Sequence, residues 1–141
     1  MFENVLLPID MAHPESWIKA LPMSAELCGG TGTLHVLGIV HDIGAAMVAN
    51  LLPDGFEEQA LQSMKSDLDA FAAREMPSGV RARVHVGYGH VAETILRSAE
   101  DVGADLIVMA SHPPDELRSL FVGSYADRVV RHAKVPVLVV R

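Results

Sequence analysis

The residue types that could do chemistry in this 141-residue chain lie where predicted strands end and helices begin. Ser124-Tyr-Ala-Asp127 follows Gly123 and has the serine-x-x-acid form of a capping box, so we predict a capped helix over 124–133. The free N–H groups and the positive dipole end at such a start favour anions such as phosphate. A plain helix cap explains the same residues, so this motif alone leaves both interpretations open.

Further polar residues follow other predicted strands. Asp10 comes after an apolar strand, and Ser111 and His112 follow another. Ligands of an open parallel α/β sheet bind beyond the carboxyl ends of its strands, so these residues are predicted to share one site. The segments at the strand ends are 8–10, 39–41, 87–89 and 110–112, and residues 123–124 complete the candidate site.

Two nucleotide or phosphate motifs of α/β proteins fit poorly. Gly87-x-Gly89-x-x-Ala92 formally matches the dinucleotide fingerprint, but the next strand has no acid at its end to hold a ribose. We therefore interpret Gly89 as a turn residue. A phospho-acceptor receiver domain needs paired acids after the first strand, and Asp10 stands alone there.

Metal and nucleophile chemistry also lack a motif. The seven histidines show no close ligand spacing, and only His41 and His112 could approach one another at strand ends, so we predict no metal site. No serine lies in a Gly-x-Ser-x-Gly elbow, and Cys28 falls inside the first predicted helix. No catalytic residue is predicted.

The composition argues against proteins that bind nucleic acid or insert into membranes. Eleven Lys+Arg against 18 Asp+Glu give a net charge of −7, which argues against nucleic acid or anionic lipid as the main partner. No apolar run is long enough for a membrane span, and the N-terminus lacks the basic region of a signal peptide. The single cysteine fits a reducing compartment. We expect one cytoplasmic domain, residues 1–141, with no membrane insertion.

The elements that must position these residues alternate between strand and helix. The alternation predicts a parallel sheet with right-handed crossovers and helices on both faces, an α/β fold. The predicted strands are 4–10 (broken at Pro8), 33–40, 80–86, 106–110 and 135–140. The predicted helices are 14–28 (kinked at Pro22), 57–76, 92–102 and 124–133, with a loop or short helix at 41–56.

Four segments make the chain similar to the universal stress protein family. They are Asn4-Val-Leu-Leu-Pro-Ile-Asp10, Gly89-His-Val-Ala-Glu-Thr-Ile-Leu96, Ala104-Asp-Leu-Ile-Val-Met109 and the stretch 129–140. The resemblance covers the chain from end to end apart from 41–56. It implies a doubly wound five-stranded parallel sheet in the order 3-2-1-4-5, with the first strand central.

The nucleotide loop of that family is altered here. Its nucleotide-binding branch carries Gly, two residues, Gly, nine residues and Gly-Ser/Thr, and Ala110 and Pro113 replace the first two glycines while Gly123-Ser124 keeps the last pair. Pro113 removes one N–H and restricts φ. Ser111-His-Pro-Pro-Asp115 resembles the Ser-His-Arg-Pro-Asp of the F/G-type subgroup, whose members bind adenine nucleotides.

The resemblance therefore implies a protein that binds ATP or ADP, with or without Mg²⁺, for stress response or regulation. Adenine would lie against Pro8, Ile9 and Ile39, with Met109 close by; Asp10 and Ala110 would meet the ribose; and Ser111, His112, Gly123, Ser124 and Tyr125 would meet the phosphates. Such a protein would be non-catalytic or slowly hydrolytic, since no general base or phosphate-binding lysine is evident. The alternative is a nucleotide-free dimer that acts through protein contacts and has a vestigial pocket.

The last predicted strand, Val135–Val140, is apolar and is expected at a sheet edge. An exposed apolar edge promotes association, and Pro136 removes only one of its N–H donors. We predict a homodimer in which two copies of this strand pair around a two-fold axis, as the family resemblance also implies. A monomer with the edge covered by 41–56 is the alternative. The protein partner that such a dimer would serve is unidentified.

Overall fold

The computed structural model describes residues 1–41, 54–111 and 119–141, the last range as backbone alone up to residue 124. It contains one five-stranded parallel sheet in the order β3-β2-β1-β4-β5. The strands are β1 (Asn4–Ile9), β2 (Thr33–His41), β3 (Arg81–Gly89), β4 (Leu106–Ala110) and β5 (Val137–Val140). The α/β class, the strand order and the central place of β1 are therefore confirmed.

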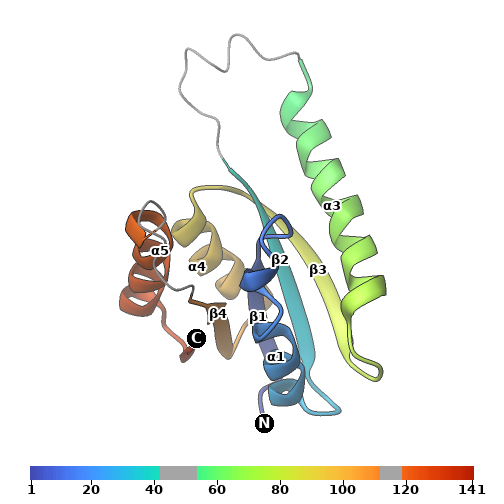
Figure 1. Cartoon of the computed structure of the whole chain (residues 1–141), viewed down its shortest axis with the longest axis vertical. Coiled ribbons are helices and arrows are strands. Elements are labelled where there is room, and N and C mark those ends of the chain that lie inside the picture. Colours follow the sequence, from blue (N-terminus) through green and yellow to red (C-terminus); the bar gives the residue numbers. More distant parts are fainter. Residues whose placement is uncertain (42–53, 112–118) are drawn as a thin grey trace.

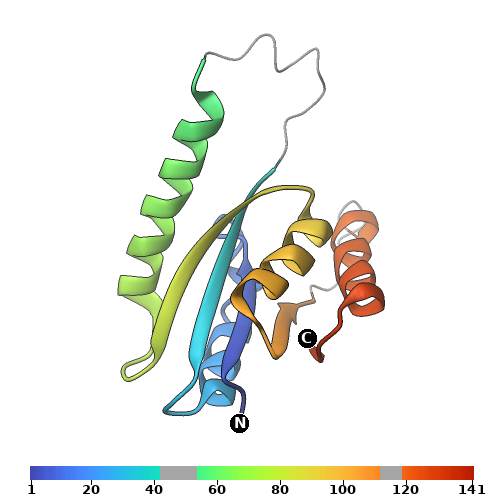
Figure 2. The same cartoon turned by 180° about the vertical axis from the view of Figure 1, so that it is seen from behind.

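Helices cover both faces of this sheet (Figures 1 and 2). They are the 3₁₀ turn η1 (Pro14–Ser16), α1 (Ala20–Cys28), α3 (Phe56–Glu75), α4 (Val91–Val102) and α5 (Ser119–His132). Helices α1 and α3 pack on one face, and α4 and α5 pack on the other. The first turns of α3 project beyond the sheet (Figure 1). Within the described residues, no helix combines the length and the apolar character needed to cross a membrane.

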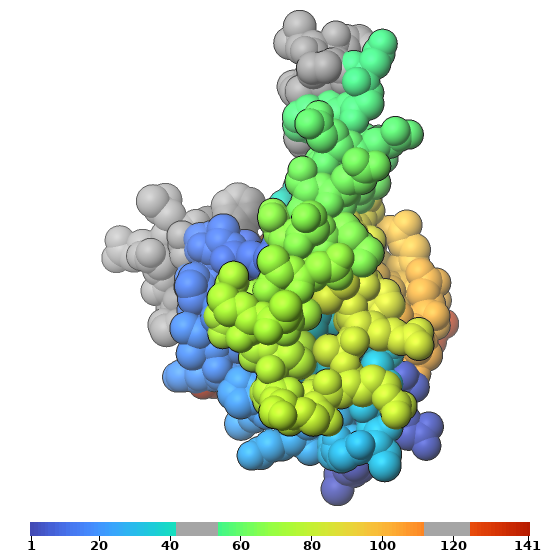
Figure 3. All heavy atoms as spheres, turned by 90° about the vertical axis from the view of Figure 1, so that its right-hand side faces the viewer, coloured from blue at the N-terminus to red at the C-terminus, as the bar shows by residue number. Residues whose placement is uncertain are grey.

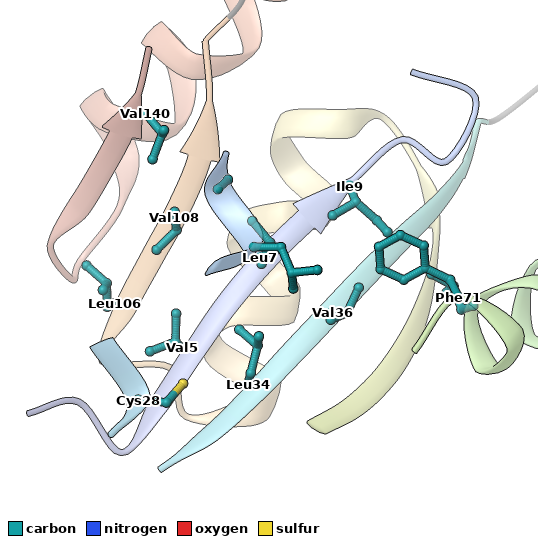
Figure 4. Packing of buried hydrophobic residues seen from close by; sticks show 13 residues of the cluster. Val5, Leu7, Ile9, Cys28, Leu34, Val36, Phe71, Leu106, Val108 and Val140 are labelled. Atoms are coloured by element: carbon teal, nitrogen blue, oxygen red, sulfur yellow. The ribbon is translucent and has the colours of Figure 1, made fainter. Parts of the chain in front are cut away.

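Alternation along each strand separates two apolar clusters. Val5, Leu7 and Ile9 of β1 face α1 and α3, and Phe71 of α3 lies beside Ile9 in the same cluster (Figure 4). Leu6 belongs to the other cluster, on the face that carries α4 and α5. Because successive residues of a strand point to opposite faces, a strand covered on both sides is apolar throughout. Each fully buried leucine here contributes about 1.5–3 kcal/mol. The two cores therefore lie on opposite faces of the sheet.

Two proline predictions need correction. Strand β1 continues through Pro8, which lies in register with Leu37 of β2. Its pairing with β4 ends at Leu6, so the N–H that Pro8 lacks interrupts no pairing between β1 and β4. The predicted helix 14–28 is two pieces, η1 and α1. Pro22 is the third residue of α1, where an N–H has no intrahelical acceptor, so the interruption precedes the proline instead of occurring at it.

The start of the last helix is also corrected. Helix α5 begins at Ser119, so Gly123 and Ser124 lie inside it and the predicted cap does not mark its first turn. A helix-interior glycine costs only about 1 kcal/mol, and Leu120 is a strong helix former. Neither Gly123 nor Leu120 therefore prevents α5 from beginning before the predicted cap. Within the predicted loop 41–56, residues 42–53 lie outside the described part of the chain. Strand β5 begins at Val137, two residues later than predicted.

Candidate functional site

A cleft of about 440 Å³ opens at the carboxyl ends of β1, β2 and β4. These are the ends at which the sequence predicted a ligand site. The structure brings seven of the predicted site residues to its lining: Pro8, Ile9, Asp10, Ile39, Met109, Ala110 and Tyr125. They come from the ends of three strands and from α5, so residues as far apart in sequence as Asp10 and Tyr125 meet at one place.

Asp10 is held in a defined turn after β1. The Ser16 hydroxyl accepts a hydrogen bond from the Asp10 N–H at 2.9 Å and donates one to the Asp10 carbonyl, also at 2.9 Å. The Asp10 carboxylate accepts a bond from the N–H of Ala12 at 3.0 Å, as in an Asx turn. Ser16 is 8% exposed. This buried hydroxyl therefore fixes the backbone of Asp10, a residue that lines the cleft.

The same turn places a histidine between two carboxylates. In His13, Nε2 lies 3.9 Å from Oδ2 of Asp10 and Nδ1 lies 3.5 Å from Oε1 of Glu15. All three side chains line the cleft, as does His41 at the end of β2. The polar part of the lining thus consists of carboxylates and imidazoles that can donate and accept hydrogen bonds. Such groups suit the hydroxyls of a sugar.

The rest of the lining is apolar and comes from both layers of helices. Met64 of α3 enters from one side, and Val91 and Ile95 of α4 enter from the other. A Cβ added to Gly38 would lie 2.9 Å from the Met64 sulfur, so the absence of a side chain at Gly38 lets α3 and Met64 approach β2 closely. Methionine and branched aliphatic side chains can accommodate a flat ring.

The whole chain matches one protein family. The model of the universal stress protein family covers residues 1–141. The chain belongs to the universal stress protein family. Universal stress protein G of Escherichia coli O157:H7 is 29% identical over the full length of both chains. A Thermus aquaticus universal stress protein, named for its place in the QAH/OAS sulfhydrylase 3′ region, is 32% identical, also over the full length of both chains.

Solved structures share the fold. Protein MJ0577 of Methanocaldococcus jannaschii has a TM-score of 0.78 at 23% identity, over 99% of this chain and 96% of that one. A universal stress protein in complex with cAMP has a TM-score of 0.63 at 17% identity (99% and 97% covered). The Archaeoglobus fulgidus protein in complex with dAMP has a TM-score of 0.59 at 19% identity (100% and 98% covered).

Four predicted residues of this universal stress protein, Ser111, His112, Gly123 and Ser124, are not among the lining residues that the structure describes. The Ser111 N–H donates to the Val140 carbonyl at 2.7 Å, which extends the pairing of β4 with β5. His112 lies outside the described residues. Gly123 and Ser124 belong to the backbone of α5, which also carries Tyr125 to the cleft.

Sequence reasoning missed several lining residues of this universal stress protein. Met64 lies on the predicted apolar stripe of α3, and Val91 and Ile95 open α4, but nothing in the sequence relates those helices to Asp10. His13, Glu15 and Ser16 follow Asp10 closely, and that closeness alone could have indicated them. Gly89 was interpreted as a turn residue, but it is the last residue of β3, where its φ of +127° is one that glycine adopts without strain.

The structure offers no obvious metal centre in the residues it describes. Across 1–41, 54–111 and 119–141, no group of three or more His, Cys, Asp or Glu side chains could hold a metal ion. The pairing of His41 with His112 considered above involves a residue outside those ranges.

Proposed function

We propose that this protein is a stress-response regulator that binds an adenine nucleotide, ATP or ADP, in the cleft. The observation that carries the proposal is the position of the cleft across β1 and β4, where the strand order reverses. Ligands of open parallel sheets bind at this switch point. The cAMP and dAMP complexes of two proteins with the same fold support adenine as the recognised base.

The lining supports a nucleoside in a defined orientation. Adenine placed against Ile39 and Met64 would bury apolar surface, and each sulfur–aromatic contact is worth about 0.3–1.5 kcal/mol. The ribose hydroxyls would then reach the Asp10 carboxylate, whose turn is fixed by Ser16. This orientation directs the phosphates toward Ala110 and Tyr125.

The negative charges of the cleft affect how it can bind phosphates. Asp10 and Glu15 line it, and its described lining contains no lysine or arginine. Phosphate groups would be repelled by these carboxylates, and a bound Mg²⁺ would offset that repulsion. We expect Mg-ATP to bind more tightly than ATP in the presence of a chelator. We further propose that the nucleotide is a regulatory ligand and is hydrolysed slowly or not at all.

Calorimetric titration with Mg-ATP and Mg-ADP, with the melting temperature Tm measured in parallel, tests the proposal. Binding should release or absorb heat, and Tm should rise with the logarithm of the ligand concentration once that concentration exceeds Kd. Asp10→Asn retains an oxygen for the Ala12 N–H but weakens the bonds to ribose, so affinity should fall by roughly tenfold or more. Asp69→Asn on α3 removes the same charge away from the cleft and should bind as the wild type does.

The opposite result has a defined meaning. Neither heat nor a change of Tm at millimolar nucleotide would reject nucleotide binding and leave the nucleotide-free alternative. The replacement of two loop glycines by Ala110 and Pro113, with Gly123 inside α5, favours that alternative. In either case we propose a cytoplasmic homodimer formed through β5, which serves a protein partner still to be identified.

A further inference from the structure

The edge strand β3 presents a row of basic side chains. In the described sheet β3 pairs only with β2, and Arg83 lies in register with His35, on the face that carries α4. Arg81 shares that face because it is two residues away, and both arginines are exposed. Figure 3 looks toward this edge and shows the atoms of β3 open between α3 and α4.

Helix α4 covers only the far end of this strand. A Cβ at Gly87 would collide with Cγ2 of Thr94, so α4 lies directly on that part of β3. A Cβ at Gly89 would lie 3.9 Å from the guanidinium of Arg97, which brings a third cation toward the same edge. We call Arg81, Arg83 and Arg97 the β3-edge arginines.

In the described part of the chain, the β3-edge arginines lack the carboxylate partners that Arg74, Arg128 and Arg131 have. Arg128 pairs with Glu93 at 2.8 Å, and Arg131 pairs with Asp127 at 3.1 Å. Among the residues that the structure describes, none of the β3-edge arginines has a carboxylate within 4.0 Å. In a chain of net charge −7, this local positive surface is uncompensated.

A chain of hydrogen bonds lies beside Arg83, on the same face of the sheet. His35 Nδ1 and His85 Nε2 are 2.8 Å apart, and His35 Nε2 lies 3.0 Å from Oδ1 of Asn4, so one hydrogen-bonded chain crosses β3, β2 and β1. Burial, followed by the nearby positive charge of Arg83, lowers the pKa of His85. His85 therefore favours its neutral form beside the arginines, and the backbone pairing of β3 with β2 keeps this part of the edge extended.

We propose that the β3 edge binds an extended acidic peptide as an added strand, with alternate carboxylates paired to the β3-edge arginines. An edge strand offers unpaired N–H and C=O groups, and strand addition uses them for affinity while side chains supply specificity. Alternate residues of a strand lie about 6.6–6.8 Å apart, so acids at every second position of the peptide match Arg81 and Arg83. Two copies of β3 would instead oppose like charges.

Fluorescence anisotropy with a labelled peptide of alternating Thr and Glu tests this proposal. Removing both strand charges with Arg81→Gln/Arg83→Gln should weaken binding roughly tenfold, since two exposed ion pairs with the peptide are lost. The matched control Arg131→Gln/Arg141→Gln removes two charges elsewhere and should change the affinity less than twofold. Equal weakening by both double variants would overturn the proposal, as would the absence of binding to wild type. Urea unfolding of each variant separates loss of the site from loss of the fold.

Modified probes test strand addition itself. In an extended peptide, alternate N–H groups point to opposite edges. Two versions of the peptide are therefore made, each with N-methyl groups on the amides that point to one of these edges. One version should lose binding, because its N–H donors facing β3 are gone, and equal binding by both would reject strand addition. A single-stranded oligothymidylate is the probe for nucleic acid. Tighter binding of this oligonucleotide than of the acidic peptide would overturn the assignment, whereas weaker binding agrees with the net charge of −7.

Discussion

The sheet ends on one side in β5 and on the other in β3, and these edges carry different side chains. Strand β5 reads Val137-Leu-Val-Val140, while the first five residues of β3 read Arg81-Ala-Arg-Val-His85. Both strands have one neighbour in the sheet and leave backbone groups on the other side. An apolar edge suits pairing with its own copy, whereas like charges suit only a partner of opposite charge. The two edges can therefore support different contacts without competing.

The largest effect is expected at the apolar edge. Leu138 packs against the buried cluster, whereas Val139 belongs to neither cluster, so Val139→Lys tests pairing with less disturbance of the core. We expect wild type to be a dimer at tens of micromolar and Val139→Lys to have half its mass by light scattering. Val130→Lys makes the same change on the exposed surface of α5 and should remain dimeric. A monomeric wild type would show that β5 does not pair with its own copy, and would contradict the expected difference between the β5 and β3 edges.

The next effect concerns how α4 covers part of β3. Gly87→Ala places a methyl group against Cγ2 of Thr94, a side chain that is 2% exposed, and overpacking of this kind costs about 1–3 kcal/mol. The free energy of unfolding in urea should fall by that amount. Thr94→Ser removes Cγ2, so in its background Gly87→Ala should be better tolerated. Gly30→Ala meets no neighbour within 4 Å and serves as control. Equal costs at both glycines would place α4 farther from β3.

The smallest effect is a pH dependence specific to the β3 side. Burial, as the first cause, lowers the pKa values of both His35 and His85 below the ordinary value near 6.5. A histidine whose folded pKa lies below its unfolded pKa contributes stability above about pH 6.5 and loses it as the pH falls through the folded value. The free energy of unfolding should therefore decrease from pH 7 to pH 5. His85→Asn removes one titrating ring and should reduce the slope; an unchanged slope would contradict this account.

The arrangement of the sheet could be predicted from the sequence because its patterns are local. Strands such as 106–110 are short apolar runs between helical stripes, and their alternation limits the fold to a parallel sheet. The position of Asp10 at a strand end followed from the same patterns. By contrast, Pro8 and Pro22 were misjudged because the effect of a proline depends on whether its missing N–H had an acceptor. That depends on the neighbouring strand or on the place in a helix.

The sequence by itself determined the strands and helices, the α/β fold class and the carboxyl ends of the strands as the place where polar residues meet. Only the tertiary structure decided which helices complete the cleft: Met64 reaches it because Gly38 lets α3 approach, and Ser16 secures Asp10 through its backbone. It also decided that Arg81 and Arg83 lie beyond the cover of α4. Periodicity specifies which side of a strand faces a helix. The length of strand that a helix covers depends on close contacts such as that between Gly87 and Thr94, which no local pattern encodes.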